Sequence, residues 1–313
     1  MTDALWGVVL AGGKGRRLSS VTGGVPKQYY APRGHRTLLE ETLRRLGNVV
    51  APARLVTVID RAHHAQATAL ARRIDLGRIA RQPMDRGTAA GVLLGVSALG
   101  APDEDLVVLT PSDHGVANPA VFRRGLRRAA DAIRRGETGV VLLAVAPSAP
   151  AGDYGWLLPA RDGRLSVDAM AAVESFEEKP EAARARDLLA AGAAWNTMVL
   201  VGRVRALLDL YRRHLPELAR TFAEARALPL DDRAAFLDEQ YPALPVADFS
   251  RDLLARASGL QAYVWPATIG WTDLGTPERL GTWLADRAQE GFFAPERLLQ
   301  LRQPCIRYRI ATP

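Results

Sequence analysis

Short apolar runs alternate with helix-like segments through the first half of the chain, and this alternation limits the fold more than any other feature. Four runs have the length and composition of buried strands: 5–11, 55–59, 106–109 and 140–145. Apolar residues recur at the spacing of one helix face in four other segments: 38–46, 62–73, 88–99 and 121–133. Strands that alternate with helices predict a mostly parallel sheet covered on both faces. Because such sheets bind ligands at the carboxyl ends of their strands, the residues that follow each run are the candidates for a binding site.

The second half is less regular. Strand-like runs occur at 153–159, 173–176, 198–201 and 260–265. Helical patterns cover 181–190 and 203–237, the latter interrupted by Pro216 and Pro229. We therefore expect an α/β protein with a Rossmann-like mixed, mostly parallel sheet. One domain is expected over residues 1–285, followed by a short helix and strand extension over 286–313, which is too small for a separate domain.

The composition is that of a compact globular protein. Of 313 residues, 48% are hydrophobic and 24% charged, and the mean hydropathy is −0.05. The first residues do not form a leader, and no run approaches the roughly 20 apolar residues that span a bilayer, so a cytoplasmic protein without a membrane partner is expected. The single cysteine, Cys305, excludes an intramolecular disulfide and a cysteine cluster for zinc.

The net charge of +7 keeps nucleic-acid binding open as an alternative. The arginines, however, occur singly or in pairs among alanines and leucines, which is typical of the wet faces of amphipathic helices. Few aromatic residues lie between them for base stacking. This distribution argues against a nucleic-acid partner.

Lysine is rare in this basic chain. The 41 basic residues include three lysines, Lys14, Lys27 and Lys179, and the rest are arginines. An ammonium is a compact point donor, whereas a guanidinium is a wide planar fork, so the two are not interchangeable at a crowded phosphate site. We interpret the three lysines as kept for lysine's own chemistry.

A glycine-rich loop follows the first predicted strand. In the stretch 10–18, Gly12, Gly13 and Gly15 leave backbone N–H groups free to converge on an anion. The loop is not a P-loop, because no Gly-Lys-Ser/Thr closes it, and it lacks the glycine spacing of a dinucleotide fingerprint. Taken alone, it is equally typical of a tight turn with solvated basic residues.

The loop and seven later segments together resemble the sugar-1-phosphate nucleotidyltransferases, with most similarity to the mannose-1-phosphate guanylyltransferase branch. The matching segments, in the family's order, are 10–18, 26–28, 82–90, 111–114, 153–156, 176–180, 195–197 and 270–275. Each is weak alone, and the specificity lies in their order and spacing from about residue 5 to 285. The resemblance implies the nucleotide-diphospho-sugar transferase fold. It also implies transfer of a nucleotidyl group from GTP to mannose-1-phosphate, releasing pyrophosphate, and leaves a homodimer open.

Such a reaction brings two phosphorylated anions together, so fixed positive charge and a metal matter more than a general base. By resemblance, Asp113 and Asp273 bind Mg²⁺, whose preference for hard oxygen ligands suits two carboxylates and phosphate oxygens. A helix cap and a turn residue are their alternative roles.

The resemblance also assigns the substrate contacts. Arg17 would hold the β- and γ-phosphates beside the glycine-loop amides, Lys27 would reach the α-phosphate, and Lys179 would hold the phosphate of the sugar. Three residues would line the sugar: Gly155, Glu178 and Asn196. The catalytic set is thus Arg17, Lys27, Asp113 and Lys179.

Base recognition would involve the backbone of Leu10, Ala11 and Gly12 and the segment from Arg86 to Thr88. In that segment Gly87 stands where the guanylyltransferases have asparagine, so a UTP- or CTP-dependent enzyme for another sugar phosphate stays open. A non-catalytic sensor of nucleotide-sugars is a third reading. The presence of both aspartates and of Lys27 and Lys179 argues against a sensor, because a pure binder does not need both metal ligands.

Overall fold

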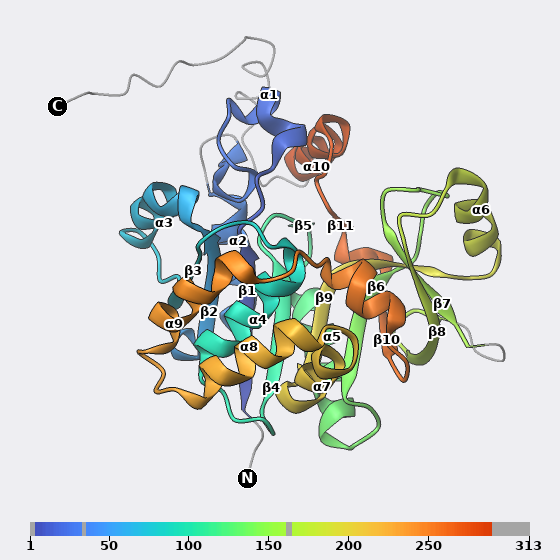
Figure 1. Ribbon diagram of the computed structural model, residues 1–313. Coiled ribbons are helices and arrows are strands. Elements are labelled where there is room, and N and C mark those ends of the chain that lie inside the picture. The colour runs from blue at the N-terminus through green and yellow to red at the C-terminus, as the bar shows by residue number, and fades with distance from the viewer. Residues whose placement is uncertain (1–3, 33–35, 161–164, 290–313) are drawn as a thin grey trace.

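A nine-stranded mixed sheet forms the centre of the molecule (Figure 1). The computed structural model describes residues 4–32, 36–160 and 165–289. The strand order along the sheet is β3-β2-β1-β4-β9-β6-β10-β8-β7, and β11 pairs with β5 in a separate two-stranded sheet. The strands are β1 (Leu5–Ala11), β2 (Leu55–Asp60), β3 (Arg78–Gln82), β4 (Leu106–Pro111), β5 (Gly115–Val116), β6 (Val140–Val145), β7 (Gly155–Pro159), β8 (Met170–Glu178), β9 (Ala194–Arg203), β10 (Gln261–Trp265) and β11 (Trp271–Thr272).

The α-helices flank this sheet and connect its strands. They are α1 (Ser19–Thr22), α2 (Leu38–Leu46), α3 (His64–Ala71), α4 (Gly87–Leu99), α5 (Pro119–Arg134), α6 (Ala182–Ala190), α7 (Val204–His214), α8 (Pro216–Ala227), α9 (Arg233–Gln240) and α10 (Pro277–Gln289). Local sequence explains where several begin. Thr37 and Glu40 form a reciprocal capping box on α2, and Asn118 caps α5 ahead of a proline in its first turn.

The sheet contains both parallel and antiparallel pairs. β1 pairs in parallel with β2 and with β4, β2 pairs in parallel with β3, and β6 pairs in parallel with β10. β9 is inserted antiparallel between β4 and β6, and β8 pairs antiparallel with β10 and with β7. The predicted Rossmann-like mixed α/β fold is therefore confirmed, and its consecutive parallel strands, β1 to β4, come from the half in which strands and helices alternate in the sequence.

Alternate residues of each central strand enter cores on opposite faces of the sheet. Val8 lies in the core formed with α4, α7 and α8, whereas Val9 lies in the core formed with α2, α3 and α5. Successive strand side chains point to opposite faces, so a strand covered on both sides reads as a continuous apolar run. Burial on both faces is the reason why these strands were predictable.

Three further predictions can be compared with the structure. The stretch 203–237 is divided into α7, α8 and α9 near the two prolines, as predicted. β3 was not predicted, because only one of its five residues is buried. The predicted domain boundary at 285 falls inside α10, while residues 290–313, with Cys305 and the predicted strand at 305–310, lie outside the described residues. Within the described residues, no helix combines the length and apolar character needed to cross a membrane.

Candidate functional site

The glycine-rich loop leaves the carboxyl end of β1 and forms one wall of a cavity of about 500 Å³. The opposite wall comes from the end of β3 and the start of α4. The lining residues include the predicted Leu10, Gly12, Gly13, Gly15 and Thr88, together with Lys14, Gln82, Asp85, Gly87 and Asp248, which the sequence reasoning had not assigned. The structure thus brings two of the predicted nucleotide-binding segments to one cavity.

Gln28 holds this loop in place. Its side-chain amide donates to the carbonyl oxygens of Ala11 (2.7 Å) and Gly13 (3.0 Å) and contacts Nδ1 of His63 at 3.3 Å. Burial is the largest influence on His63 and lowers the pKa of its imidazole, so the ring is kept neutral beside the amide. These bonds fix the conformation of the loop where it lines the cavity.

The segment from Arg86 to Thr88 joins this wall to a distant part of the chain. The Arg86 guanidinium donates to the carbonyl oxygens of Tyr241 (3.2 Å) and Pro242, and Arg86 is not among the residues that line the cavity. Thr88 donates to the Asp248 carboxylate at 3.1 Å and accepts from the Phe249 N–H at 2.7 Å. Arg86 therefore braces the segment in this structure.

Gly87 has a structural reason to depart from the asparagine of the resemblance. Its φ is +80°, and a Cβ there would lie 2.1 Å from the carbonyl oxygen of Ala247. The Ala247 backbone is also bonded on both sides, to the Ala89 N–H and the Arg86 carbonyl. A side chain cannot enter without moving this backbone, so glycine is required by the close approach.

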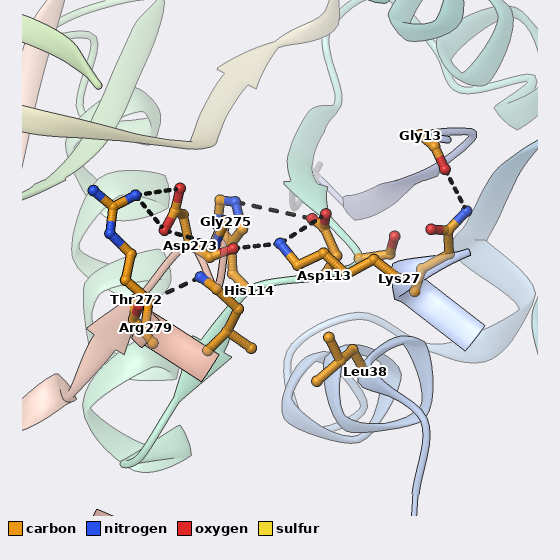
Figure 2. A network of polar contacts seen from close by, with 12 residues as sticks. Gly13, Lys27, Leu38, Asp113, His114, Thr272, Asp273, Gly275 and Arg279 are labelled. Atoms are coloured by element: carbon orange, nitrogen blue, oxygen red, sulfur yellow. Dashed lines mark hydrogen bonds and ion pairs between the residues drawn. The ribbon is translucent and has the colours of Figure 1, made fainter. Parts of the chain in front are cut away.

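Lys27 connects the two predicted metal ligands. Its Nζ lies 3.1 Å from Oδ2 of Asp113 and donates to the backbone carbonyl of Asp273 (Figure 2). Gly15 lies close to the backbone of Lys27, since a Cβ on this glycine would lie 2.9 Å from the Lys27 backbone nitrogen. The lysine side chain is 8% exposed. Asp113 and Asp273 therefore meet around one cation, which in this structure is an ammonium.

The charges around Asp113 keep it ionised. Burial is the largest influence and alone would raise the pKa of its carboxyl, but the Lys27 ammonium 3.1 Å away lowers the pKa below its ordinary value. His114 itself is packed at 5.3 Å from the Trp271 ring, and burial lowers its pKa to about 4. His114 is thus a neutral neighbour, and Asp113 is the anion of the pair.

The carboxylate of Asp273 points away from Lys27 and into a second network (Figure 2). Its oxygens accept from Arg279 at 3.1 and 3.2 Å, from the Tyr154 hydroxyl at 3.2 Å and from the Gly275 N–H at 3.0 Å. The next residue, Leu274, is fully buried with a φ of +51°, an unfavourable conformation for leucine that fixes the turn. Arg279 and Tyr154 were not assigned from sequence, although Tyr154 lies in a quoted motif.

The predicted sugar-binding residues lie together on the antiparallel part of the sheet. Gly155 on β7 faces Glu178 on β8 in register, and β7 also pairs with β9 beside Asn196. A Cβ on Gly155 would lie 2.8 Å from Oε2 of Glu178. Lys179 follows β8 with a φ of +50°, bonds through its N–H to the Tyr154 carbonyl and pairs with Glu178.

Arg17 is exposed and is not among the residues that line the glycine-loop cavity. Burial raises the pKa of the Asp153 carboxyl, but Arg279 and, more weakly, Arg17 lower it below its ordinary value. Arg17 therefore lies toward Asp153, on the side of the site where the sugar-binding residues begin. The predicted phosphate contact of Arg17 stays a prediction.

The donor groups at Asp113 and Asp273 suit a hard divalent cation. They are carboxylate and carbonyl oxygens with a tyrosine hydroxyl nearby, and the Asp113 side chain is 32% exposed, so a ligand can reach it. Among the residues the structure describes, no group of three or more histidine, cysteine, aspartate or glutamate side chains is placed to hold a metal. Oxygen donors of this kind are those that Mg²⁺ prefers, with phosphate oxygens and water to complete its shell.

Comparisons with known proteins identify related chains. The family described as nucleotidyl transferase matches residues 6–290. AlgA, an alginate biosynthesis protein of Pseudomonas aeruginosa, is 30% identical over 276 residues, which is 86% of this chain and 56% of AlgA. The mannose-1-phosphate guanylyltransferase of Escherichia coli is 27% identical over 285 residues, 87% of this chain and 58% of that protein. This chain spans little more than half the length of these curated relatives.

A solved structure resembles the whole described fold. The crystal structure titled mannose-1-phosphate geranyltransferase, from Thermus thermophilus, superposes with a TM-score of 0.76 at 29% identity, covering 90% of this chain and 79% of that one. A mannose-6-phosphate isomerase from Helicobacter pylori, at 18% identity and a TM-score of 0.67, shares the fold; the match covers 86% of this chain and 99% of that one.

Proposed function

Because the chain belongs to the nucleotidyl transferase family, we propose that it transfers the nucleotidyl group of GTP to mannose-1-phosphate and releases pyrophosphate. The observation that carries this proposal is the contact of Lys27 with both Asp113 and Asp273 beside the glycine-loop cavity. The Asp113 carboxylate, the Asp273 backbone carbonyl and the Lys27 ammonium come from three distant segments and converge where the α-phosphate of a bound nucleotide would lie. The names of the relatives support the sugar and the base.

The residues suit a transfer that needs no general base, because the attacking phosphate is already ionised at neutral pH. The glycine-loop amides and Arg17 would bind the triphosphate, and Lys27 would offset the charge that builds on the α-phosphate. Lys179, Glu178, Asn196 and Gly155 would orient the sugar phosphate for attack. Positioning and charge compensation would thus supply most of the catalysis.

We further propose that Asp113 and Asp273 hold Mg²⁺. When bound, the ion would neutralise charge on the phosphates and so lower the repulsion between the two anions. The oxygen donor set and the ionised Asp113 support this assignment.

Asp85 and Asp248 line the cavity, and both carboxylates are already bonded to groups of the chain itself. The guanine assignment therefore rests on the names of the relatives.

The test is a matrix of the four nucleoside triphosphates plus dTTP against mannose-, glucose- and galactose-1-phosphate with Mg²⁺, scored by pyrophosphate release. We expect the highest kcat/KM for GTP with mannose-1-phosphate. A higher value for UTP or CTP would replace the base assignment. Nucleotide-sugar binding without pyrophosphate release from any pair would show a sensor instead.

A further inference from the structure

Arg279 contacts the Asp273 carboxylate directly (Figure 2). It lies in the first turns of α10, and its Nη1 contacts Oδ1 and Oδ2 of Asp273 at 3.1 and 3.2 Å. The same nitrogen lies 2.6 Å from Oδ2 of Asp153. One guanidinium therefore bridges two carboxylates that are distant in the chain, and only one of them, Asp273, is an assigned metal ligand.

The contacts of Asp273 are close to complete without a metal. Arg279, the Tyr154 hydroxyl and the Gly275 N–H all donate to its Oδ1, and the side chain is 18% exposed. A carboxylate offers about four acceptor positions in total. A divalent cation that used this carboxylate would compete directly with the guanidinium, since two cations on one carboxylate repel each other.

Asp153 gives Arg279 a second place to bind. The 2.6 Å contact to Asp153 is shorter than either contact to Asp273, and the Tyr154 ring stacks under the guanidinium with its centre 4.6 Å away. Arg279 can therefore release Asp273 while it keeps Asp153 and the ring. The guanidinium thus has two possible binding positions, on Asp273 and on Asp153, and only the position on Asp273 blocks the metal ligand.

We propose that Arg279 is a positioning residue that neutralises Asp273 and competes with the divalent cation for it. Free metal alone does not displace the guanidinium from Asp273, the second protein ligand. The metal-nucleotide complex, which is also bound by Asp113 and the glycine loop, displaces the guanidinium so that it contacts Asp153 alone. This inference rests on the proposed assignment of Mg²⁺ to Asp113 and Asp273. Its consequence is that the chain binds free metal weakly and metal-nucleotide well.

The experiment measures Mn²⁺ binding to the full chain without nucleotide, from the electron paramagnetic resonance signal of free Mn²⁺. We expect Arg279→Met to bind Mn²⁺ at least about fivefold more tightly than the unmodified chain, the lower end of ordinary coupling between sites. The gain should vanish in the double variant Arg279→Met/Asp273→Asn, which should match Asp273→Asn alone. An affinity unchanged in Arg279→Met, or a gain that survives in the double variant, overturns the proposal.

Two controls separate this role from simpler ones. Arg17→Met also removes a positive charge from near Asp153 and should leave Mn²⁺ affinity within about twofold, the scatter ordinary for a screened surface charge. A gain equal to that of Arg279→Met would mean that general charge explains the effect and would refute the proposal. If Arg279→Met fails to fold, Arg279→Gln removes the charge but keeps a polar side chain that can donate to Asp153. This variant should still bind Mn²⁺ more tightly, and no gain would again refute the proposal.

The readout is independent of the transfer reaction. A chain that shows the Mn²⁺ pattern but releases no pyrophosphate with any substrate pair would support the role of Arg279 and contradict the proposed function. If the unmodified chain turns over GTP and mannose-1-phosphate but Arg279→Met leaves Mn²⁺ affinity unaltered, the proposed function would be supported and the role of Arg279 contradicted. An Arg279 that only stabilises the fold would lower the unfolding temperature when replaced and leave Mn²⁺ affinity unchanged.

Discussion

The ammonium of Lys27 lies 3.1 Å from the carboxylate of Asp113 and is also bonded to the backbone of Asp273, 246 residues further along the chain. The Lys27 side chain is 8% exposed, so its charge is held in a fixed and largely dry position. Preorganised charge of this kind costs no rearrangement when negative charge develops beside it. Removing either charged member of this pair should therefore impair the transfer.

We expect Lys27→Ala and Asp113→Ala each to slow pyrophosphate release by about tenfold or more, because each removes a charge from the point where the substrates meet. Lys27→Arg should not restore the rate, because the Lys27 side chain is 8% exposed and a wide planar guanidinium does not replace a compact ammonium held between Asp113 and Asp273. Steady-state kinetics with GTP and mannose-1-phosphate measures the effect. Turnover that survives both alanine changes would remove the site assignment.

Replacing each of two exposed lysines should weaken the binding of a different substrate. Lys179 pairs with Glu178 near the predicted sugar site, whereas Lys14 pairs with Asp85 across the glycine-loop cavity at 3.3 Å. Lys179→Ala is expected to raise KM for the sugar phosphate about tenfold with little change for the nucleotide, because uniform binding of one substrate is lost. Lys14→Ala is the matched control and should raise KM for the nucleotide instead. The same KM shift in both variants would contradict the separation.

Gly87 should be among the least replaceable glycines. Gly87→Ala would place a Cβ against the carbonyl of Ala247, whereas Gly136 has a similar φ of +77° and open space around it. We expect Gly136→Ala to lower the free energy of unfolding by about 1 kcal/mol, the ordinary cost of the left-handed conformation. Gly87→Ala should cost about 2 kcal/mol more, because packed backbone must move. Urea unfolding of both variants measures the difference, and equal losses would show that the clash relaxes freely.

Stability should fall on mild acidification partly through His63. Burial lowers the pKa of His63 in the folded chain, so the unfolded chain binds its proton more readily. The free energy of unfolding therefore decreases as the pH falls through about 6.5, the ordinary value for histidine, toward the lower value of the folded state. Protonation would also disturb the contact with Gln28 and with it the glycine loop.

The measurement is urea unfolding at several pH values between about 7 and 5, which bracket the ordinary histidine pKa. His63→Gln should make stability less dependent on pH, while His64→Gln, at an exposed neighbouring position, should leave the dependence unchanged. Identical pH profiles for His63→Gln and the unmodified chain would exclude this account. Buried His114 adds to the same trend, with its pKa lowered to about 4, so the slope should decrease without disappearing.

Much of the fold could be predicted because burial leaves a periodic record in the sequence. β1, β4 and β6 are buried on both faces and read as continuous apolar runs, and the helices between them show one apolar face. β3 escaped prediction because it borders the sheet with Arg78 exposed and little apolar content. The insertion of β9 between β4 and β6 also left no local signal, since strand order depends on contacts between distant residues.

The sequence by itself determined the α/β class and the glycine loop at the end of the first strand, and it predicted Lys27, Asp113 and Asp273 as site residues. These conclusions depend on residue type, short spacing and order along the chain. Only the tertiary structure decided that Asp273 turns its carboxylate to Arg279 and its carbonyl to Lys27, and that Ala247 excludes a side chain at Gly87. The physical reason is that a carboxylate binds whichever cation the packing of the chain brings near. Packing joins segments that are far apart in the sequence, and their local sequences do not indicate that they are in contact.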